Sequence, residues 1–267
     1  MSIITLITDF GLKDSYVGVM KGVILDIAPQ VTLIDISHEI APQDVQGAAY
    51  VLYTAYPYFP EGTIHLVVVD PGVGSERRAI AVQTPRAYFV APDNGVLSYV
   101  LAREPVKGMV SLNNPHYWLP EVRSGRPVAP TFHGRDIFAP AAAHLARGVP
   151  LANLGEPLSE IITFPLPKPQ IRPDGIIIGH VLHVDRFGNL ITDVESGHIE
   201  GKRGLTVEVA GRMIEGLGLT FSSVEEGELV AYLGSAGYLE VAVRGGSAAQ
   251  ELGIKTGDRV VIRWRNS

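Results

Sequence analysis

The sequence predicts a two-domain protein, with an N-terminal α/β domain around a mostly parallel sheet and a smaller C-terminal all-β barrel domain. In the first 160 residues, short apolar strands alternate with stretches of helical periodicity. Beyond residue 174, short β-rich runs are separated by glycine turns, which is typical of a small barrel or sandwich. The 267 residues are enough for two modest domains, each with its own core.

The expected strands of the N-terminal domain are continuous apolar runs, as in parallel sheets that are covered on both faces. They are Ile3–Thr8, Val31–Ser37, Ile64–Val69, Ala79–Gln83 and Ala87–Ala91. Helical spacing of apolar residues predicts helices between these strands. The expected helices are a segment capped by Asp14 or Ser15, then Asp44–Ala55, Gly95–Arg103 and Ile137–Arg147. Pro140 makes the start of the last helix uncertain.

Residues 161–174 contain four prolines and predict an extended linker, because proline cannot continue a helix or a central strand. We therefore expect the N-terminal domain over residues 1–160 and the β-barrel domain over residues 175–267. The β runs of the second domain are Gly175–Val184, Leu190–Val194, Leu205–Val209, Leu229–Leu233, Tyr238–Val243 and Arg259–Trp264, with one helical turn at Ala248–Leu252.

Composition excludes several function classes. The chain has no cysteine, which excludes disulfides, thiol nucleophiles and Cys-based metal sites. A net charge of −6 with scattered basic residues argues against nucleic acid as a partner. No apolar run reaches the about 20 residues that cross a bilayer. The first residues, Ser2-Ile3-Ile4, lack the basic segment of a secretory signal, so we expect a cytoplasmic protein.

Aspartates follow several of the expected strands. Asp9 and Asp70 come directly after apolar strands, and Asp93 follows another closely. Because the carboxyl ends of parallel strands line the ligand crevice of an α/β sheet, we expect these side chains at one edge. The Asp9 carboxylate can accept two hydrogen bonds from a ribose diol; alternatively, it caps a turn.

The segment from Asp70 to Arg78 is rich in glycine, with Gly72 and Gly74 allowing close approach of the backbone to a ligand. Asp70 and Arg77 can pair across this loop and position a third group. Neither of the common phosphate-loop patterns occurs in it, which excludes that interpretation. The alternative is an exposed β-turn with an ion pair.

Two further clusters carry groups with useful chemistry. His133 precedes an expected helix and can exchange hydrogen bonds with a small polar reactant, whereas the other seven histidines show no metal-binding spacing. In the second domain, Asn189 offers the donor and acceptor that match an adenine edge, Phe187 a stacking face and Asp185 an ammonium partner. Alternatively, the residues of this segment simply form a turn between two strands.

Five segments, in order, resemble one family over essentially the whole chain. They are Thr8-Asp9-Phe10-Gly11, Asp70-Pro71-Gly72-Val73-Gly74 with Arg77, Ala91-Pro92-Asp93-Asn94-Gly95, Thr131-Phe132-His133-Gly134-Arg135-Asp136 and Asp185-Arg186-Phe187-Gly188-Asn189. The sequence is similar to the S-adenosyl-L-methionine (SAM) hydroxide adenosyltransferases, SAM hydrolases that form adenosine and methionine and are related to fluorinases and chlorinases. The resemblance implies an α/β domain followed by a β-barrel. It also implies a homotrimer whose SAM lies between the N-terminal domain of one subunit and the C-terminal domain of the next.

The resemblance also implies roles for individual residues. Asp70, Arg77 and His133 match the catalytic, water-handling triad. The implied substrate-binding residues are Asp9 for the ribose diol, Asp14 and Asp185 near the methionine ammonium, and Phe187 and Asn189 at the adenine. Relatives place an arginine near the methionine carboxylate where this chain has Ala236, which leaves Ser235 and backbone groups for that carboxylate.

Three further functions stay open beside hydrolysis of SAM. The halogenating relatives have a tyrosine at the position of Asp70, a hydroxyl residue at that of Gly134 and an additional loop, which favours water over halide here. Halogenation of SAM is the first of these alternatives. The second is a non-catalytic SAM- or adenosine-binding module, and the third is a metal-dependent hydrolase. We expect no metal and no cofactor, because the sulfonium of SAM leaves as a neutral thioether and no phosphoryl or carbonyl oxygen needs polarising.

Overall fold

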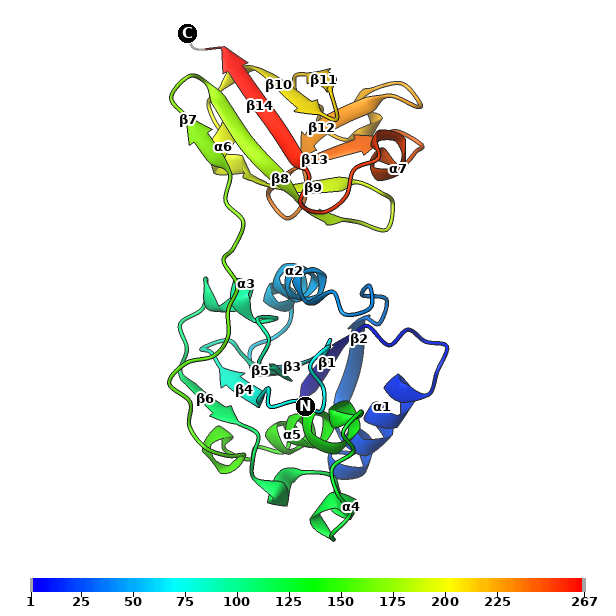
Figure 1. The fold of residues 1–267 in the computed structure, drawn as a ribbon, viewed down its shortest axis with the longest axis vertical. Helices are drawn as coiled ribbons and strands as arrows, with labels where there is room; N and C mark the ends of the chain where they lie inside the picture. Colours follow the sequence, from blue (N-terminus) through cyan, green and yellow to red (C-terminus); the bar gives the residue numbers. More distant parts are fainter. Residues whose placement is uncertain (1, 266–267) are drawn as a thin grey trace. The chain divides into compact units, whose positions relative to one another are not determined.

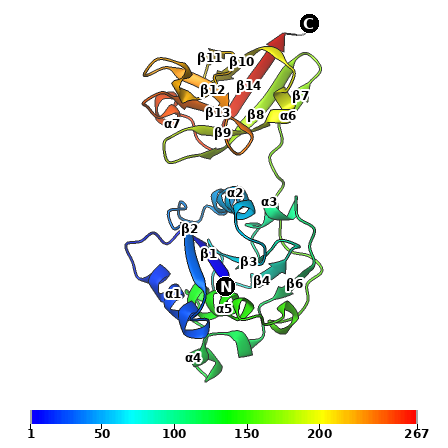
Figure 2. The same cartoon turned by 180° about the vertical axis from the view of Figure 1, so that it is seen from behind.

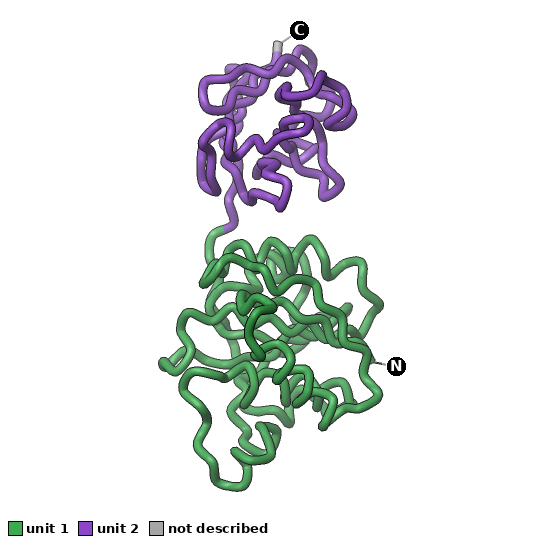
Figure 3. Tube along the Cα trace, turned by 90° about the vertical axis from the view of Figure 1, so that its right-hand side faces the viewer, with its two compact units in different colours: residues 1–165 green, residues 166–267 purple. Residues whose placement is uncertain are grey.

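The computed structural model describes residues 2–265 and confirms the predicted fold class. The chain forms two compact units, residues 1–165 and residues 166–267 (Figure 3). The first unit is an α/β domain, and the second consists almost entirely of antiparallel β-strands. No helix of the described residues is long and apolar enough to cross a membrane.

The first unit is built on a six-stranded sheet with the order β2-β1-β3-β5-β4-β6. Its strands are β1 (Ile3–Thr8), β2 (Thr32–Ser37), β3 (Thr63–Val68), β4 (Ala79–Gln83), β5 (Ala87–Pro92) and β6 (Gly108–Ser111). Strands β2, β1, β3 and β5 are parallel, and β4 and β6 join them in antiparallel pairing. The sheet is thus parallel where the expected site residues follow its strands.

Helices cover both faces of this sheet (Figures 1 and 2). The helices of this unit are α1 (Tyr16–Ile27), α2 (Val45–Ala55), α3 (Ser98–Leu101), α4 (Pro120–Arg123) and α5 (Ala139–Ala146). Helices α1 and α5 lie on one face and α2 on the other, whereas the short α4 lies away from the sheet (Figures 1 and 2). Alternate residues of β1, Ile4 and Leu6, share a fully buried core with α1 and α5. On the other face, α2 begins after Asp44, whose side chain caps the helix by accepting a hydrogen bond from Gly47 N at 2.8 Å.

Two predicted helices differ from the structure. In the predicted helix Gly95–Arg103, only Ser98–Leu101 is α-helical, because Gly95 has a φ of +94° and the ring of Phe164 occupies the space beside its Cα. The predicted helix Ile137–Arg147 is preceded by a π-helical turn at Gly134–Phe138, and the α-helix begins only at Ala139. Pro140 lies in the first turn of α5, where its missing N–H is tolerated.

The second unit is an eight-stranded antiparallel sheet that curls into a nearly closed barrel. Its elements are β7 (Gln170–Arg172), β8 (Ile176–Val184), β9 (Leu190–Glu195), α6 (Ser196–Ile199), β10 (Arg203–Val209), β11 (Arg212–Glu215), β12 (Leu229–Leu233), β13 (Tyr238–Val243), α7 (Ala248–Leu252) and β14 (Arg259–Arg265). Gly218 N, after β11, donates to Ala231 O in β12 at 2.8 Å and so links the two end strands. The sequence patterns do not predict the short elements β7, β11 and α6.

The beginning of the proline-rich segment is anchored to the first unit. Ile162 N donates to the buried Asp93 carboxylate at 2.7 Å, and Phe164 N donates to Ser98 Oγ at 2.9 Å. Arg78 holds the other oxygen of Asp93 at 2.7 Å and reaches Glu160 O at 3.1 Å. These bonds explain why the first compact unit extends as far as Pro165.

Candidate active site

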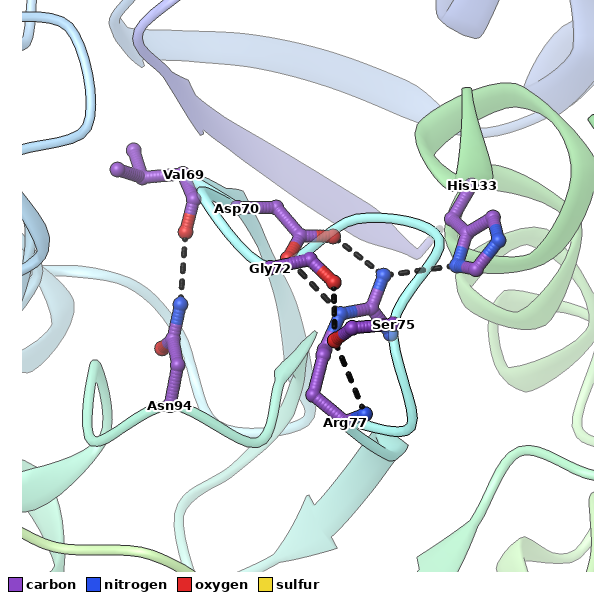
Figure 4. Close-up of polar contacts among 7 residues, drawn as sticks. All are labelled: Val69, Asp70, Gly72, Ser75, Arg77, Asn94 and His133. Carbon is purple, nitrogen blue, oxygen red and sulfur yellow. Dashed lines mark hydrogen bonds and ion pairs between the residues drawn. The ribbon is translucent and has the colours of Figure 1, made fainter. Parts of the chain in front are cut away.

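Two expected site residues of the first unit, Asp9 and Asp70, lie where its parallel strands end: Asp9 follows β1 and Asp70 comes just after β3. Asn94, to which the sequence assigns no role, lies just beyond β5. Asn94 Nδ2 donates to Val69 O at 2.9 Å, which secures the backbone immediately before Asp70 (Figure 4). Motifs that are far apart in the sequence are therefore brought to one edge of the sheet, as the parallel arrangement dictates.

Asp70, Arg77 and His133 form one hydrogen-bonded network (Figure 4). Arg77 Nε donates to Asp70 Oδ1 at 2.8 Å, and Arg77 Nη2 contacts Asp70 Oδ2, so the guanidinium binds the carboxylate in a bidentate manner. The same Nη2 donates to His133 Nδ1 at 2.8 Å. The side chains of Arg77 and Asp70 are only 9% and 5% exposed. The guanidinium also lies 5.2 Å from the centre of the Phe138 ring.

The loop between Asp70 and Arg77 is shaped by its glycines and by Ser75. Ser75 Oγ donates to Gly72 O at 2.6 Å and accepts from Arg77 N at 3.3 Å. Gly74 has a φ of +79°, and a Cβ there would lie 2.4 Å from Pro130 O. Only glycine allows this approach to the loop that carries His133.

The hydrogen bond from Arg77 determines the protonation of His133. Arginine has no acceptor, so Nδ1 must accept, and the neutral ring then carries its proton on Nε2. Burial lowers the pKa of His133, and the neighbouring Arg77 charge lowers it further, while Asp70 and Asp136 act in the opposite direction. The neutral imidazole can therefore donate a hydrogen bond from Nε2.

A cavity of about 400 Å³ lies beside this network. Its lining residues come from the β1 end, α1, the segment before α2, the β3 end and the loop before α5. They are Asp9, Phe10, Tyr16, Gln43, Val68, Asp70, Pro71, Val73, Thr131, Phe132, His133 and Gly134. The cavity thus collects Asp9, Asp70 and His133, whereas Arg77 binds the latter two without lining the cavity itself.

Three aromatic rings form one wall of the cavity. Tyr16 and Phe132 have ring centres 5.3 Å apart, and Phe10 lies 5.6 Å from Tyr16 and 6.1 Å from Phe132. The sequence patterns assign no role to these rings. Phe10 and Phe132 lie beside Asp9 and His133 in the sequence, which is a signal for them, but Tyr16 carries no such signal and reaches the wall only through the packing of α1.

Asp9 is held by a residue in an unusual conformation. Gln43 N donates to Asp9 Oδ2 at 2.8 Å, and Gln43 has a φ of +67°, which is uncommon for a residue with a side chain. One carboxylate oxygen of Asp9 is thereby occupied. Asp14, by contrast, is exposed just before α1 and does not line the cavity, so the first unit alone does not bring it to the other site residues.

The remaining expected site residues lie in the second unit. Asp185 organises the turn between β8 and β9: its carboxylate accepts from Phe187 N, Asn189 N and Asn189 Nδ2, each at 2.9 Å. Phe187 is 75% exposed at this turn. Ser235 lies in the turn after β12. Asp185 therefore stabilises the turn as the sequence indicates, and the turn presents Phe187 at the surface of its unit.

Two further polar residues of the second unit lie near Asp185. Tyr232 and Glu240 are cross-strand neighbours in β12 and β13. Burial raises the pKa of Glu240, and the Asp185 charge raises it further, while a hydrogen bond from Tyr232 has the opposite effect. Burial and the Glu240 charge likewise raise the pKa of the Tyr232 phenol. No sequence pattern singles out either residue.

No group of three His, Asp or Glu side chains within residues 2–265 is placed to hold a metal ion. The polar side chains that line the cavity include the carboxylates of Asp9 and Asp70 and the imidazole of His133, and the Arg77 guanidinium binds Asp70 and His133. The fold and the site together define a class of two-domain protein. Its first unit is α/β, with such a network at the carboxyl edge of the sheet, and its second unit is antiparallel β.

Family models match both units. The N-terminal domain of the SAM hydroxide adenosyltransferases matches residues 4–155, and the C-terminal domain of the same family matches residues 179–261. The chain therefore belongs to the SAM hydroxide adenosyltransferase family, and the predicted resemblance is confirmed.

Individual relatives agree with this assignment. An (R)-S-adenosyl-L-methionine hydrolase from Thermus thermophilus is 45% identical, covering 94% of this chain and 95% of the relative. A fluorinase from an Actinoplanes species is 29% identical, with 97% of each chain covered. A crystal structure of an uncharacterized conserved protein from Thermotoga maritima has a TM-score of 0.88 at 39% identity, covering 98% of this chain and 100% of that chain.

Proposed function

We propose that this chain hydrolyses SAM to adenosine and L-methionine. Water attacks the C5′ carbon in line with the C5′–S bond, and methionine leaves with both electrons of that bond. The network of Asp70, Arg77 and His133 beside a cavity of about 400 Å³ is the observation that carries the proposal. Membership of the family and 45% identity to a named SAM hydrolase support it.

The reaction makes modest chemical demands. The sulfonium is already a good leaving group, so the protein must align one water at about 3–3.5 Å from C5′ and exclude competing solvent. The proposal accordingly includes no metal ion and no cofactor.

The hydrogen-bond geometry supports a division of labour within the network. Each Asp70 oxygen is engaged by Arg77 but keeps a lone pair, so the carboxylate can orient a water and accept its proton as the C5′–O bond forms. His133 Nδ1 is occupied by Arg77, which leaves Nε2–H to donate to the attacking oxygen. One proton is released per turnover, and it passes from Asp70 to solvent.

The surroundings of Gly134 support water rather than halide as the nucleophile. A Cβ at this position would lie 3.1 Å from Met20 Sδ and 3.2 Å from a ring carbon of Phe132. The hydroxyl residue that the resemblance implies for halogenating relatives would fit here only if both neighbours moved. Halide incorporation is therefore an outcome of the labelling experiment and not our proposal.

Incubation of the purified protein with SAM in heavy-oxygen water tests the reaction. We expect adenosine labelled at its 5′-oxygen and unlabelled methionine in equal amounts. Adenosine without the label would overturn in-line attack by water, and a 5′-halo-adenosine formed in chloride or fluoride buffer would replace our proposal with halogenation. Stable binding of SAM without products over hours would indicate a non-catalytic binding module.

The remaining roles are proposed on the family resemblance. Asp9 binds the ribose diol, Asp14 and Asp185 the methionine ammonium, Phe187 and Asn189 the adenine, and Ser235 the methionine carboxylate. On the same resemblance, we propose a homotrimer in which SAM is shared between subunits. We also propose that the protein is cytoplasmic.

Mixed oligomers test the shared site. An Asp70→Asn chain and an Asn189→Ala chain, each inactive alone, should recover activity when they are mixed under conditions that exchange subunits. Native mass spectrometry of the same sample should show mixed trimers. Mixed trimers without recovered activity would contradict a site shared between subunits.

A further inference from the structure

A buried histidine holds the loop that carries Asp9. His38 Nδ1 lies 2.8 Å from Thr8 Oγ1, and His38 O accepts from Gly11 N at 2.8 Å. His38 is 4% exposed and Thr8 is fully buried. The side chain and the backbone of one histidine thus hold both ends of the loop from Thr8 to Gly11.

Charged neighbours determine which ring nitrogen of His38 carries the proton. Lys21 Nζ donates to Asp35 Oδ2 at 2.5 Å, and Asp35 Oδ1 lies 2.9 Å from His38 Nε2, although the N–H is not aligned for a hydrogen bond. Burial raises the pKa of Asp35, but the interactions with Lys21 and His38 outweigh it, and the pKa is lowered overall. The attraction of the charged carboxylate favours a proton on Nε2, which leaves His38 Nδ1 as an acceptor.

The Thr8 hydroxyl then has a defined orientation. It donates to His38 Nδ1, and its oxygen accepts from Phe10 N at 3.3 Å. Polar contacts therefore run from the cavity loop through the buried Thr8 and His38 to Asp35, whose side chain is partly exposed. Asp9 lies between Thr8 and Phe10, the two residues whose positions these contacts fix.

The other side of Asp9 is held from the loop that follows His38. Gln43 N donates to Asp9 Oδ2, and the left-handed conformation of Gln43 aims that N–H at the carboxylate. The bond at 2.8 Å uses one lone pair of Oδ2, so Asp9 keeps Oδ1 and the second lone pair of Oδ2 for a ligand in the cavity.

The residue types resemble a nucleophilic triad, but the hydroxyl cannot act as one. Thr8 is fully buried and is not among the residues that line the cavity. We propose that His38, with Thr8 and Asp35, positions Asp9 for the 2′- and 3′-hydroxyls of the adenosyl group. This proposal rests on the proposed function. The relay of Thr8, His38 and Asp35 is a positioning device for substrate binding and takes no part in bond breaking.

Replacement of the Thr8 hydroxyl tests the relay with a matched control. Thr8→Val keeps the volume and removes the hydroxyl, whereas Thr8→Ser keeps the hydroxyl. We expect Thr8→Val to raise KM for SAM about tenfold, with kcat changed less than about threefold, because a lost bond misplaces a ligand-binding carboxylate. Thr8→Ser, which keeps the hydroxyl, should stay close to the parent protein.

A substrate without the 2′-hydroxyl separates positioning from general damage. With 2′-deoxy-SAM, the difference in KM between Thr8→Val and Thr8→Ser should shrink to about twofold or less, because less of the diol remains to be held. An undiminished difference, or a loss in kcat alone, would overturn the proposal.

Adenosine binding provides a readout that does not require turnover. In calorimetry, Thr8→Val should weaken adenosine binding about tenfold relative to Thr8→Ser. If the parent protein binds adenosine but produces none from SAM, the proposed function fails while this comparison still decides the relay. Equal adenosine affinity of the two variants would refute the relay, whatever the reaction.

Discussion

Asp70 and Asp136 in the first unit both have buried side chains bound by arginine, and they differ in what surrounds them. Asp70 is held by Arg77, which also donates to His133. Asp136 accepts from Arg126 Nη2 at 2.8 Å and Arg135 Nε at 2.6 Å, and its other oxygen accepts from Ala129 N at 2.7 Å. Both carboxylates are therefore charged centres of a hydrogen-bonded cluster.

Only Asp70 of these two faces the cavity. It lines the cavity with bonding capacity left on its oxygens, and its arginine side chain is 9% exposed. Asp136 is fully buried and does not line the cavity, and its two arginine side chains are 37% and 29% exposed. The bonds of Asp136 tie the segment before His133 to the start of the helix. An ion pair is thus a candidate for catalysis only where it retains bonding capacity toward a ligand.

Replacement of Asp70 should give the largest effect on turnover. Asp70→Asn keeps the shape but removes the negative charge and the proton acceptor, so kcat for SAM should fall by about 100-fold or more. Affinity for SAM in calorimetry should change much less. Full activity of Asp70→Asn and of His133→Ala would remove the catalytic assignment of the network.

Asp136→Asn should show the opposite pattern. It leaves two arginine side chains without their charge partner, and we expect a loss of about 2–3 kcal/mol in the free energy of unfolding, measured in urea. The loss is below that of a fully buried pair, because both arginines reach solvent. Turnover should fall less than about tenfold. If Asp136→Asn lost activity as strongly as Asp70→Asn without losing stability, the contrast between the clusters would be wrong.

The alternation of apolar strands and helices predicts the α/β class of the first unit and five of its six strands, but not β6 or the short helix α4. The helix after Asp44 illustrates why: its apolar stripe predicts a helix with one face in the core, and the structure buries Ala48, Ala49 and Leu52 of that stripe. The start of α3 is mispredicted because a residue far along the chain, Phe164, occupies the space beside Gly95. Such a contact has no local signature in the sequence.

The site is predictable in part for a similar reason. Asp9 and Asp70 follow parallel strands, so their shared edge is predictable from topology. The position of Tyr16 depends on how α1 packs against Phe132 in the loop before α5. That of Gln43 depends on its hydrogen bond to Asp9 and on a backbone conformation that glutamine rarely adopts. Likewise, His38 lies just after an ordinary strand and reveals its contacts only in three dimensions.

The titration of His133 distinguishes the influence of the two clusters. Burial and Arg77 lower its pKa, whereas Asp70 and Asp136 raise it. Arg77→Gln should therefore raise the pKa of His133 toward its usual value of about 6.5, and Asp136→Asn should lower it further, as measured by NMR with His133→Gln as the assignment control. Shifts of the same sign in both variants would contradict this distinction.

The lowered pKa of His133 also gives stability a pH dependence. The unfolded chain takes up a proton on this histidine near a pH of about 6.5, before the folded protein does. The contribution of His133 is therefore complete above about pH 6.5 and is lost as the pH falls toward the folded-state pKa. His133→Gln should reduce the acid sensitivity of unfolding in urea over that interval, and an unchanged pH dependence would contradict the lowered pKa.

The smallest effects should come from the two arginines of the Asp136 cluster, and they should differ in kind. Arg126→Ala removes a partly exposed partner, while Arg135 and Ala129 N still satisfy the carboxylate, so we expect about 1 kcal/mol or less in stability and turnover within about twofold. Arg135 additionally lies 5.3 Å from the centre of the Phe132 ring, which belongs to the cavity wall.

Arg135→Ala should therefore raise KM for SAM about threefold at similar stability, because the Phe132 ring loses its cation partner and one wall of the cavity loosens. Arg135→Lys should bring KM part of the way back to the parent value, because it returns a positive charge to the face of the Phe132 ring. Steady-state kinetics of the three variants would separate the contributions. Equal KM values for Arg126→Ala and Arg135→Ala would show that the Asp136 cluster supports only the fold and does not reach the cavity through Phe132.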